Sequence, residues 1–253
     1  MINGSANCRK RAKTVNDIFM KYKTRGAYHW DQISHNPLKR NPFVVGRYRN
    51  VIILLKSCIE ESNNSMKILD LGCGDGVLTH LIGKSGNKVV GLDSSIEGIA
   101  IAREKSKNNR IEFIEGSVYD MPFEDNSFDI IVSSDVIEHL DNVEQYLNEM
   151  ERVVKEQGHI IISTPIRISF NPLDIEHKVE WFEEEYQTLI GRRYPQTTFY
   201  RSHPLFFLEI LNKFRFRFLF SMLSIFYNPF SGFDSSYFKY YTLQYSVSKN
   251  TED

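Results

Sequence analysis

The chain has 253 residues, a length that fits one α/β domain with additions and argues against two full domains. Its 31 basic and 32 acidic residues give a formal net charge of −1, which offers no overall attraction to nucleic acid. Cys8, Cys58 and Cys73 lie far apart without a CxxC or Cys/His spacing, which argues against a disulfide framework or a zinc site and favours a reducing, cytoplasmic location.

The first part of the chain, residues 1–46, is predicted to form an N-terminal arm. It starts polar and basic, with a short helical pattern over residues 15–20. It has no apolar run like that of a secretory signal peptide, so we expect no signal peptide. Residues 25–43 combine aromatic residues, histidines and two prolines, which indicates a segment folded over another part of the chain. Tyr28 and Trp30 in this segment either close over a ligand as a lid or simply anchor the arm.

A helix predicted over residues 47–61 is followed by short β-rich runs that alternate with amphipathic helices. We expect strands at 67–72, 88–93, 111–117, 128–135 and 158–165, and helices at 76–85, 95–107 and 143–156. Two later runs, 196–202 and 240–249, are expected to form an antiparallel hairpin at the sheet edge. This alternation predicts an α/β fold: a doubly wound, Rossmann-like sheet of seven strands covered on both faces.

An aromatic-rich insertion, residues 203–239, separates the last two predicted strands. It is dense in Phe and Tyr and interleaved with Lys213, Arg215 and Arg217. It is either a small helical pack, or a surface that serves as a substrate lid, a subunit interface or a contact with a membrane. Its most apolar stretch, residues 218–227, is too short to span a bilayer. The predicted domain therefore comprises residues 47–202 and 240–253, and we expect a soluble or at most peripheral protein.

The sequence "DLGCGDG" places three glycines, Gly72, Gly74 and Gly76, directly after the first predicted strand. Glycine at such a turn lets the backbone pass close to a ligand. A dinucleotide fingerprint needs G-x-G-x-x-G, but position 77 is Val, so a nicotinamide dinucleotide is disfavoured. Asp93 ends the second predicted strand, where a carboxylate can bind both hydroxyls of a ribose. Alternatively, Asp93 or Ser94 caps the next helix.

In these motifs and in "LDSS", "MPF" and "FDIIVSSDVIEHL", residues 66–166 resemble the class I S-adenosylmethionine-dependent methyltransferases, in particular the type 11, ubiquinone-methyltransferase-like branch. The resemblance implies S-adenosylmethionine as the cofactor. It implies that the cofactor contacts Asp70, Gly72, Cys73, Gly74, Asp93, Ser94, Ser117, Val118 and Ser134, with Tyr28 and Trp30 closing over it. The family's usual Asp-Ala pair beside the adenine is here Ser117-Val118, which leaves one uncharged hydrogen-bonding group.

The implied chemistry is an in-line displacement at a methyl group that the cofactor has already activated, so no metal is required. His139 and His177 are the candidate catalytic residues, because a histidine can accept a hydroxyl proton near neutral pH. Alternatively, His139 is a packing residue and His177 fixes its loop.

The expected reaction is O-methylation of a small molecule, preferably a saccharide or glycan-linked acceptor, since the sequence is similar to methyltransferases of sugar and surface-glycan pathways. The alternatives are a quinone, lipid-precursor or amine acceptor, or a catalytically silent cofactor-binding protein. We expect residues 203–239 to contact either a membrane or a second copy of the chain. We do not expect the protein to bind nucleic acid.

Overall fold

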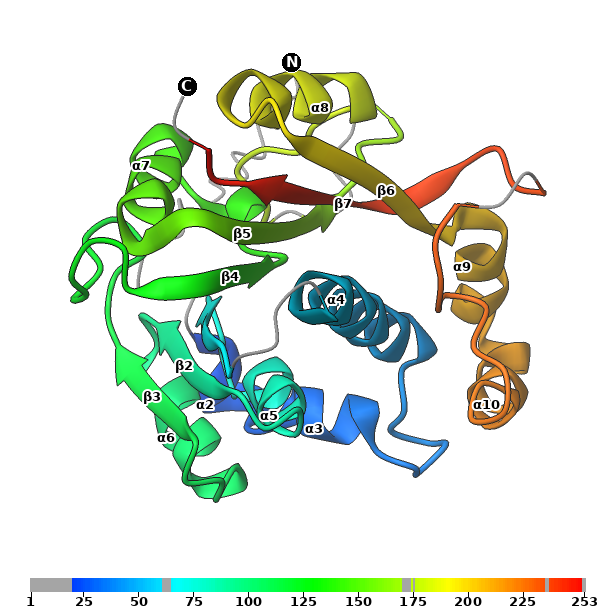
Figure 1. Ribbon diagram of the computed structural model, residues 1–253. Coiled ribbons are helices and arrows are strands. Elements are labelled where there is room, and N and C mark those ends of the chain that lie inside the picture. Colours follow the sequence, from blue (N-terminus) through cyan, green and yellow to red (C-terminus); the bar gives the residue numbers. More distant parts are fainter. Residues whose placement is uncertain (1–19, 61–64, 170–173, 175, 235–236, 252–253) are drawn as a thin grey trace, which may run out of the picture.

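A computed structural model describes residues 20–60, 65–169, 174, 176–234 and 237–251 of the chain. In this part, seven strands form one sheet with the order β3-β2-β1-β4-β5-β7-β6 (Figure 1). The strands are β1 (Lys67–Leu71), β2 (Lys88–Asp93), β3 (Ile111–Glu115), β4 (Phe128–Ser134), β5 (Val154–Pro165), β6 (Thr197–Pro204) and β7 (Tyr241–Lys249). β1 to β5 pair in parallel, whereas β7 runs antiparallel to both β5 and β6. The predicted doubly wound sheet with its antiparallel terminal hairpin is confirmed.

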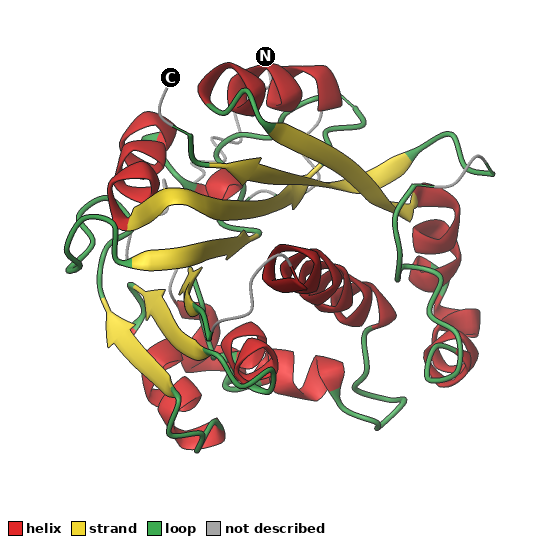
Figure 2. Ribbon diagram, in the orientation of Figure 1, coloured by secondary structure: helices red, strands yellow, loops and turns green. Residues whose placement is uncertain are grey.

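Helices cover both faces of the sheet (Figure 2). They are α2 (Met20–Arg25), α3 (Tyr28–Ile33), α4 (Pro42–Glu60), α5 (Val77–Gly83), α6 (Ile96–Lys105), the 3-10 turn η1 (Ile137–His139), α7 (Val143–Val153), α8 (Glu183–Arg193), α9 (Leu205–Asn212) and α10 (Phe214–Leu223). α4 and α5 lie on one face, and α7 and α8 lie on the other (Figure 1). No helix in the described part of the chain is long and apolar enough to cross a membrane.

The central strands are apolar at nearly every position because each face of the sheet carries its own core. Ile68 and Ile130 pack into the cluster under α4 and α5, whereas Leu69 and Ile131 point to the cluster under α7 and α8. All four side chains are 0% exposed. Burying one such side chain contributes about 1.5–3 kcal/mol to the free energy of folding, so the two clusters fix the register that brings the strand ends together.

The structure differs from the sequence-based elements at several places, among them β5, which begins at Val154 instead of residue 158. α4 begins at Pro42 instead of residue 47. Proline suits the first turn of a helix, because the N–H groups there make no hydrogen bond within the helix and proline lacks only such a group. α8 lies in a region for which no helix was predicted. The helical pattern over residues 15–20 lies outside the described residues except for Met20, where α2 begins, and Cys8 lies outside them too.

The α9–α10 region is joined to the first half of α4. Asn50 donates from Nδ2 to the carbonyl oxygen of Phe230 at 3.1 Å, and Asn228 donates to that of Pro42 at 2.8 Å. A Cβ atom on Gly46 would lie 2.5 Å from that of Phe230, so only glycine allows this approach. The insertion therefore rests on the helix that also carries Arg47 and Tyr48, two residues of the cavity described next.

Candidate functional site

A cavity of about 590 Å³ lies where β1, β2 and β4 end. β1 lies between β2 and β4, so the chain order of the strands reverses here, which is where doubly wound folds bind ligands. The volume falls in the range of small-molecule sites, about 300–1,000 Å³. Eleven of the thirteen predicted site residues line the cavity: Tyr28, Asp70, Gly72, Cys73, Asp93, Ser94, Ser117, Val118, Ser134, His139 and His177. Gly74 and Trp30 do not line it.

The glycine turn after β1 approaches other protein atoms, not only the cavity. A Cβ atom on Gly72 would lie 2.3 Å from Cγ2 of Val136, and one on Gly74 would lie 1.9 Å from the hydroxyl oxygen of Tyr22. Both glycines have positive φ, 69° and 55°. The space beside the Cα of Gly74 is filled by Tyr22 of α2, so the absence of a side chain at Gly74 lets the arm approach, and its contact with the cofactor stays a prediction.

The Asp93 carboxylate is held in place by two backbone amides. Oδ2 accepts a hydrogen bond from the N–H of Gly74 and Oδ1 from that of Ser95, each at 2.8 Å. Burial raises the pKa of Asp93 and these two amides oppose the rise. Each oxygen keeps a second lone pair, so the carboxylate fits the two hydroxyls of a ribose. The cap of α6 is Ser95, which accepts from the N–H of Gly98, and not Asp93 or Ser94.

Asp70 lies at the end of β1 and is 1% exposed. Its Oδ2 accepts a hydrogen bond of 2.6 Å from the hydroxyl of Thr79. Burial raises its pKa to about 7, although the Thr79 hydrogen bond opposes the shift. A nearby cationic group, such as the ammonium of an amino acid, would stabilise the ionised form of this buried carboxyl. The methionine portion of S-adenosylmethionine carries such an ammonium group.

The predicted arm residues Tyr28 and Trp30 have separate positions. Tyr28 lines the cavity, whereas the Trp30 ring packs against His80 and its Nε1 donates to the carbonyl oxygen of Asp75 at 2.8 Å. His29 also contacts Asp75, through its backbone N–H at 3.1 Å and through Nδ1 at 3.0 Å. Trp30 therefore anchors the arm, as the alternative interpretation held, and Asp75 of the glycine turn is an anchor that the sequence-based reasoning missed.

The cavity also holds charged residues that were missed. Arg47 of α4 forms an ion pair with Asp135, which follows β4 with a positive φ of 55°. The Nε atom of Arg47 is buried and has no hydrogen-bond partner among the described residues. No local motif in the sequence marks Arg47, because the pair joins a helix and a strand end that lie 88 residues apart.

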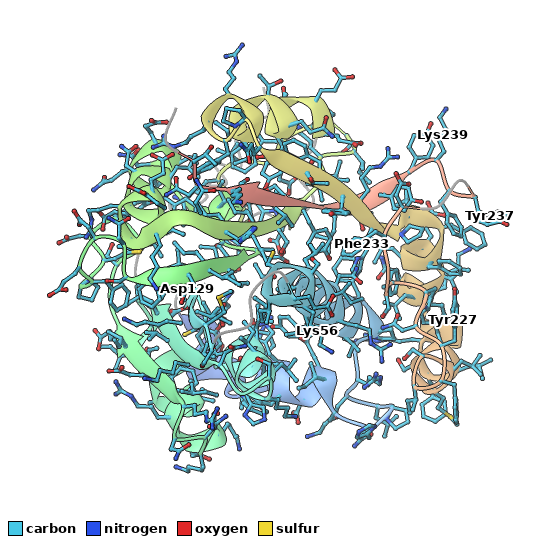
Figure 3. All side chains as sticks on the ribbon, in the orientation of Figure 1. Lys56, Asp129, Tyr227, Phe233, Tyr237 and Lys239 are labelled. Atoms are coloured by element: carbon cyan, nitrogen blue, oxygen red, sulfur yellow. The ribbon has the colours of Figure 1, made fainter. Side chains whose placement is uncertain are left out.

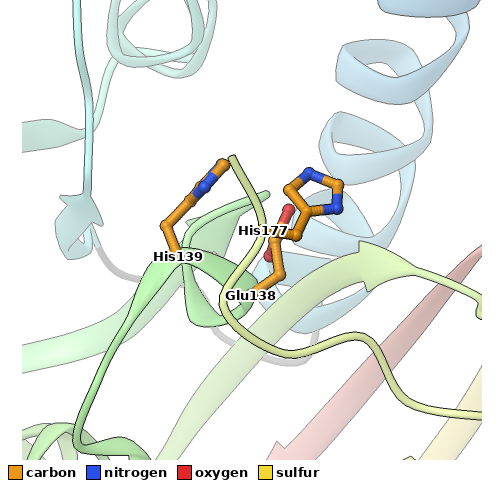
Figure 4. A group of neighbouring side chains, drawn as sticks. All are labelled: Glu138, His139 and His177. Carbon is orange, nitrogen blue, oxygen red and sulfur yellow. The ribbon is translucent and has the colours of Figure 1, made fainter. Parts of the chain in front are cut away.

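His139 and His177 are brought together in the cavity. Their ring centroids are 5.0 Å apart, although one lies in η1 and the other in the segment after β5. The carboxylate of Glu138 lies beside them (Figure 4), and the three residues can each place one nitrogen or oxygen within 4.8 Å of the others. Burial lowers the pKa of His139, which keeps its ring neutral near pH 7. A neutral imidazole can accept a proton.

Comparison with known proteins matches the central part of this chain to a family model. Residues 69–162 match the model of the methyltransferase domain family. A probable S-adenosylmethionine-dependent methyltransferase of Mycolicibacterium smegmatis is 34% identical over 105 residues, which cover 42% of this chain and 40% of that protein. The mitochondrial ubiquinone biosynthesis O-methyltransferase of Rattus norvegicus is 36% identical over 107 residues, which cover 40% of this chain and 31% of that protein. The chain thus spans well under half the length of these curated relatives.

Among solved structures, phosphoethanolamine N-methyltransferase 2 of Haemonchus contortus in complex with S-adenosyl-L-methionine matches with a TM-score of 0.65 and 19% identity. The match covers 96% of this chain and 61% of that one. At this identity the likeness concerns the fold alone. It extends beyond the region of the family model to nearly the whole chain.

Proposed function

We propose that this chain, a class I S-adenosylmethionine-dependent methyltransferase, transfers the methyl group of its cofactor to an oxygen of a small-molecule acceptor. One observation carries the proposal: residues suited to the cofactor and a cluster of titratable side chains share a single cavity. Asp70 and Asp93 mark the cofactor end, and His139 and His177 mark the acceptor end. The cofactor supplies a methyl group on a sulfonium cation, so the protein has to align the acceptor and dispose of its proton.

We favour a saccharide or glycan-linked acceptor. The acceptor end combines the tyrosine rings of Tyr28 and Tyr48 with the hydrogen-bonding groups of Arg47 and Asp135. Aromatic faces beside polar groups suit a sugar, which has apolar C–H faces and several hydroxyls. Burial raises the pKa of Tyr48 to about 12, so its hydroxyl stays protonated and can donate a hydrogen bond.

A lipid-linked or quinone-type acceptor is the second candidate. A relative's name includes ubiquinone biosynthesis. Large apolar side chains are also exposed around α9 and α10, including Phe226, Tyr227 and Tyr237 at 90%, 76% and 89%. Tyr227, Tyr237 and Lys239 lie on the outer side of this region (Figure 3). Such a surface suits a peripheral membrane contact or a dimer. We propose the cytoplasm as the location, because Cys58 and Cys73 are free thiols.

The test is to add S-adenosylmethionine with a trideuterated methyl group to cell extracts and to identify the labelled products by mass spectrometry. Sugar, quinone, lipid and amine fractions are examined separately. We expect label on an oxygen of a saccharide-containing compound. Label on a quinone or an amine would replace the proposed acceptor class. Absence of label from every fraction, with intact cofactor binding, would indicate a silent cofactor-binding protein.

A further inference from the structure

We propose that α10 and the turn after it form a docking surface for a membrane that contains anionic lipids. The outer side of this segment, which we call the α10 face, carries apolar side chains at helical spacing that are 41% to 90% exposed: Phe218, Leu219, Met222, Leu223 and Phe226. The proposal concerns where the protein binds and not what it methylates, so it does not depend on the acceptor class proposed above.

The inner side of the same segment is polar, which reverses the usual arrangement of a helix on a protein surface. Ser221 and Ser224 are 1% and 3% exposed. The hydroxyl of Ser221 donates to the carbonyl oxygen of Arg40, and that of Ser224 accepts from Nε of Arg40, each at 3.4 Å. α10 is therefore attached to the protein through serines and turns its apolar residues outward, where only an external partner can cover them.

The insertion also has an aromatic core of its own, so the outward side chains are not the result of incomplete packing. The Phe220 ring of α10 lies 6.0 Å from that of Phe230, which is 0% exposed. The Phe207 ring of α9 lies 5.3 Å from that of Phe238 and 6.4 Å from that of Phe230. One set of aromatic residues thus holds the insertion together, and a second set on the α10 face takes no part in that core.

The charges of the insertion favour an anionic surface. Residues 203–239 include four basic and two acidic residues, although the whole chain has a net charge of −1. Lys213, which precedes α10, and Arg217 within it are both exposed. Each Lys or Arg held near an anionic membrane strengthens binding by about fivefold. An apolar face with basic neighbours is typical of helices that lie in the plane of a membrane interface.

Tyrosines and a lysine extend this surface on the outer side of the insertion. Tyr227 and Tyr237 are 76% and 89% exposed, and both lie on the outer side together with Lys239 (Figure 3). A tyrosine combines an apolar ring with a polar hydroxyl, which suits the boundary between acyl chains and headgroups. Because no helix in the described part of the chain is long and apolar enough to cross a membrane, the proposed contact is with one leaflet.

A second copy of the chain fits the α10 face less well than a membrane does. In a two-fold dimer the same surface of each copy meets itself, so Lys213 and Arg217 would approach the same cations of the partner. The acidic residues of the insertion are Glu209 and Asp234. Asp234 is already paired with Arg201 at 2.5 Å, which leaves Glu209 within the described part of the insertion to offset the repulsion.

The test is co-sedimentation of the full-length protein, without cofactor or acceptor, with vesicles of phosphatidylcholine and phosphatidylglycerol in a ratio of about 2:1. We expect binding that weakens as salt is added, because salt screens the attraction to the anionic lipid. Pure phosphatidylcholine vesicles should bind at least about tenfold more weakly.

Two variants of the segment are compared with two matched controls. Phe226→Ala should weaken vesicle binding about tenfold or more through lost apolar contact, and Arg217→Gln about fivefold. The controls are Ile96→Ala and Lys105→Gln, which change an exposed apolar and an exposed basic residue of α6, on the other side of the molecule (Figure 1). Both controls should bind as the wild type does.

Phe226→Trp locates the contact. On addition of anionic vesicles its fluorescence should shift to shorter wavelength, and lipids with brominated acyl chains should quench it, because the indole then leaves water. Wild-type protein, whose tryptophans Trp30 and Trp181 lie outside the insertion, provides the background signal.

The proposal is wrong if wild-type protein that is folded by circular dichroism does not sediment with anionic vesicles. It is also wrong if Phe226→Ala and Arg217→Gln bind them as tightly as the α6 controls do. A dimer in analytical ultracentrifugation that Phe226→Ala abolishes, with no spectral shift of Phe226→Trp on vesicles, would assign the α10 face to a second copy instead. Methyl transfer enters none of these measurements, so failure of this proposal leaves the proposed function untouched, and the reverse also holds.

Discussion

The two ends of the cavity are built in different ways. At the cofactor end, Asp70 and Asp93 lie at the ends of adjacent strands, and their carboxylates accept hydrogen bonds from Thr79, Gly74 and Ser95. At the acceptor end, side chains from distant segments meet, and two buried polar atoms, Nε of Arg47 and Oε1 of Glu138, have no partner among the described residues. Each carboxylate of the first group already has a hydrogen-bond partner in the protein, whereas the second group includes buried atoms that have none among the described residues and that a ligand can satisfy.

The largest expected effect is at the cofactor end, in Gly74→Val. The new side chain would meet the Tyr22 hydroxyl, and valine is strained at a φ of 55°. We expect loss of measurable S-adenosylmethionine binding by calorimetry, because α2 is pushed off the turn and the Gly74 N–H is drawn away from Asp93. Gly74→Ala in a Tyr22→Phe background is the matched comparison, and it should bind better than Gly74→Ala alone. Equal binding by these two variants would show that Tyr22 is not the obstacle.

At the acceptor end, His139→Ala and His177→Ala should each lower kcat by about 10²–10⁴-fold while the cofactor affinity changes little. The reason is that the proposed function assigns both rings to the acceptor's proton and neither ring to the ribose or methionine contacts. Steady-state kinetics across pH 6–9 and calorimetry with S-adenosylhomocysteine measure the two quantities separately. If kcat falls only in His139→Ala, proton removal is assigned to that ring alone. If either variant also loses cofactor affinity, that histidine contributes to cofactor binding as well.

A pH effect is expected from Asp70. Its pKa is about 7 in the folded chain because of burial, against about 3.9 in an unfolded chain. Between these values the folded state binds more protons than the unfolded state, so the free energy of unfolding falls as pH rises from about 4 to 7. Relative to Asp70→Asn, the wild type should lose up to a few kcal/mol over this range in urea unfolding. Parallel curves for the two proteins would mean that Asp70 is already ionised.

The smallest effect is expected from Trp30→Phe, which removes the hydrogen bond to the Asp75 carbonyl and keeps an aromatic ring against His80. One such hydrogen bond contributes about 1 kcal/mol, so the melting temperature should fall by a few degrees and kcat should change less than about threefold. Differential scanning calorimetry and initial rates provide the measurements. A loss of kcat comparable to that of His139→Ala would restore Trp30 to the site.

The fold and the positions of the two strand-end carboxylates in the cavity could be predicted because their signals are local. The strands over residues 67–165 are short apolar runs, and the Asp70 and Asp93 positions follow from where such runs end. α8 was missed because its short sequence carries six charges or amides among eleven residues and only two buried side chains. The division into arm, domain and insertion is tested by none of these contacts and stays a prediction.

The acceptor end could be predicted only in part. His139 and His177 were singled out from the sequence, but their proximity depends on how the segment after β5 crosses η1. The contact of His139 with the Glu176 carbonyl depends on the same crossing, whereas the contact of His177 with Glu180 is local, three residues along the chain. For Trp30 the sequence left both interpretations open, because an aromatic residue in this segment fits a lid and an anchor equally well. Only the hydrogen bond to Asp75 separates the two.

The anchoring of the arm at Asp75 has a consequence for the rate at which the enzyme can turn over. Asp75 lies inside the glycine turn, so His29 and Trp30 attach the arm to the same five-residue loop that bends around the cofactor end. Tyr22 and Tyr28 of the same arm line the cavity. We expect that weakening the contacts of His29 and Trp30 with Asp75 loosens this wall of the cavity and speeds release of S-adenosylhomocysteine at the expense of cofactor affinity.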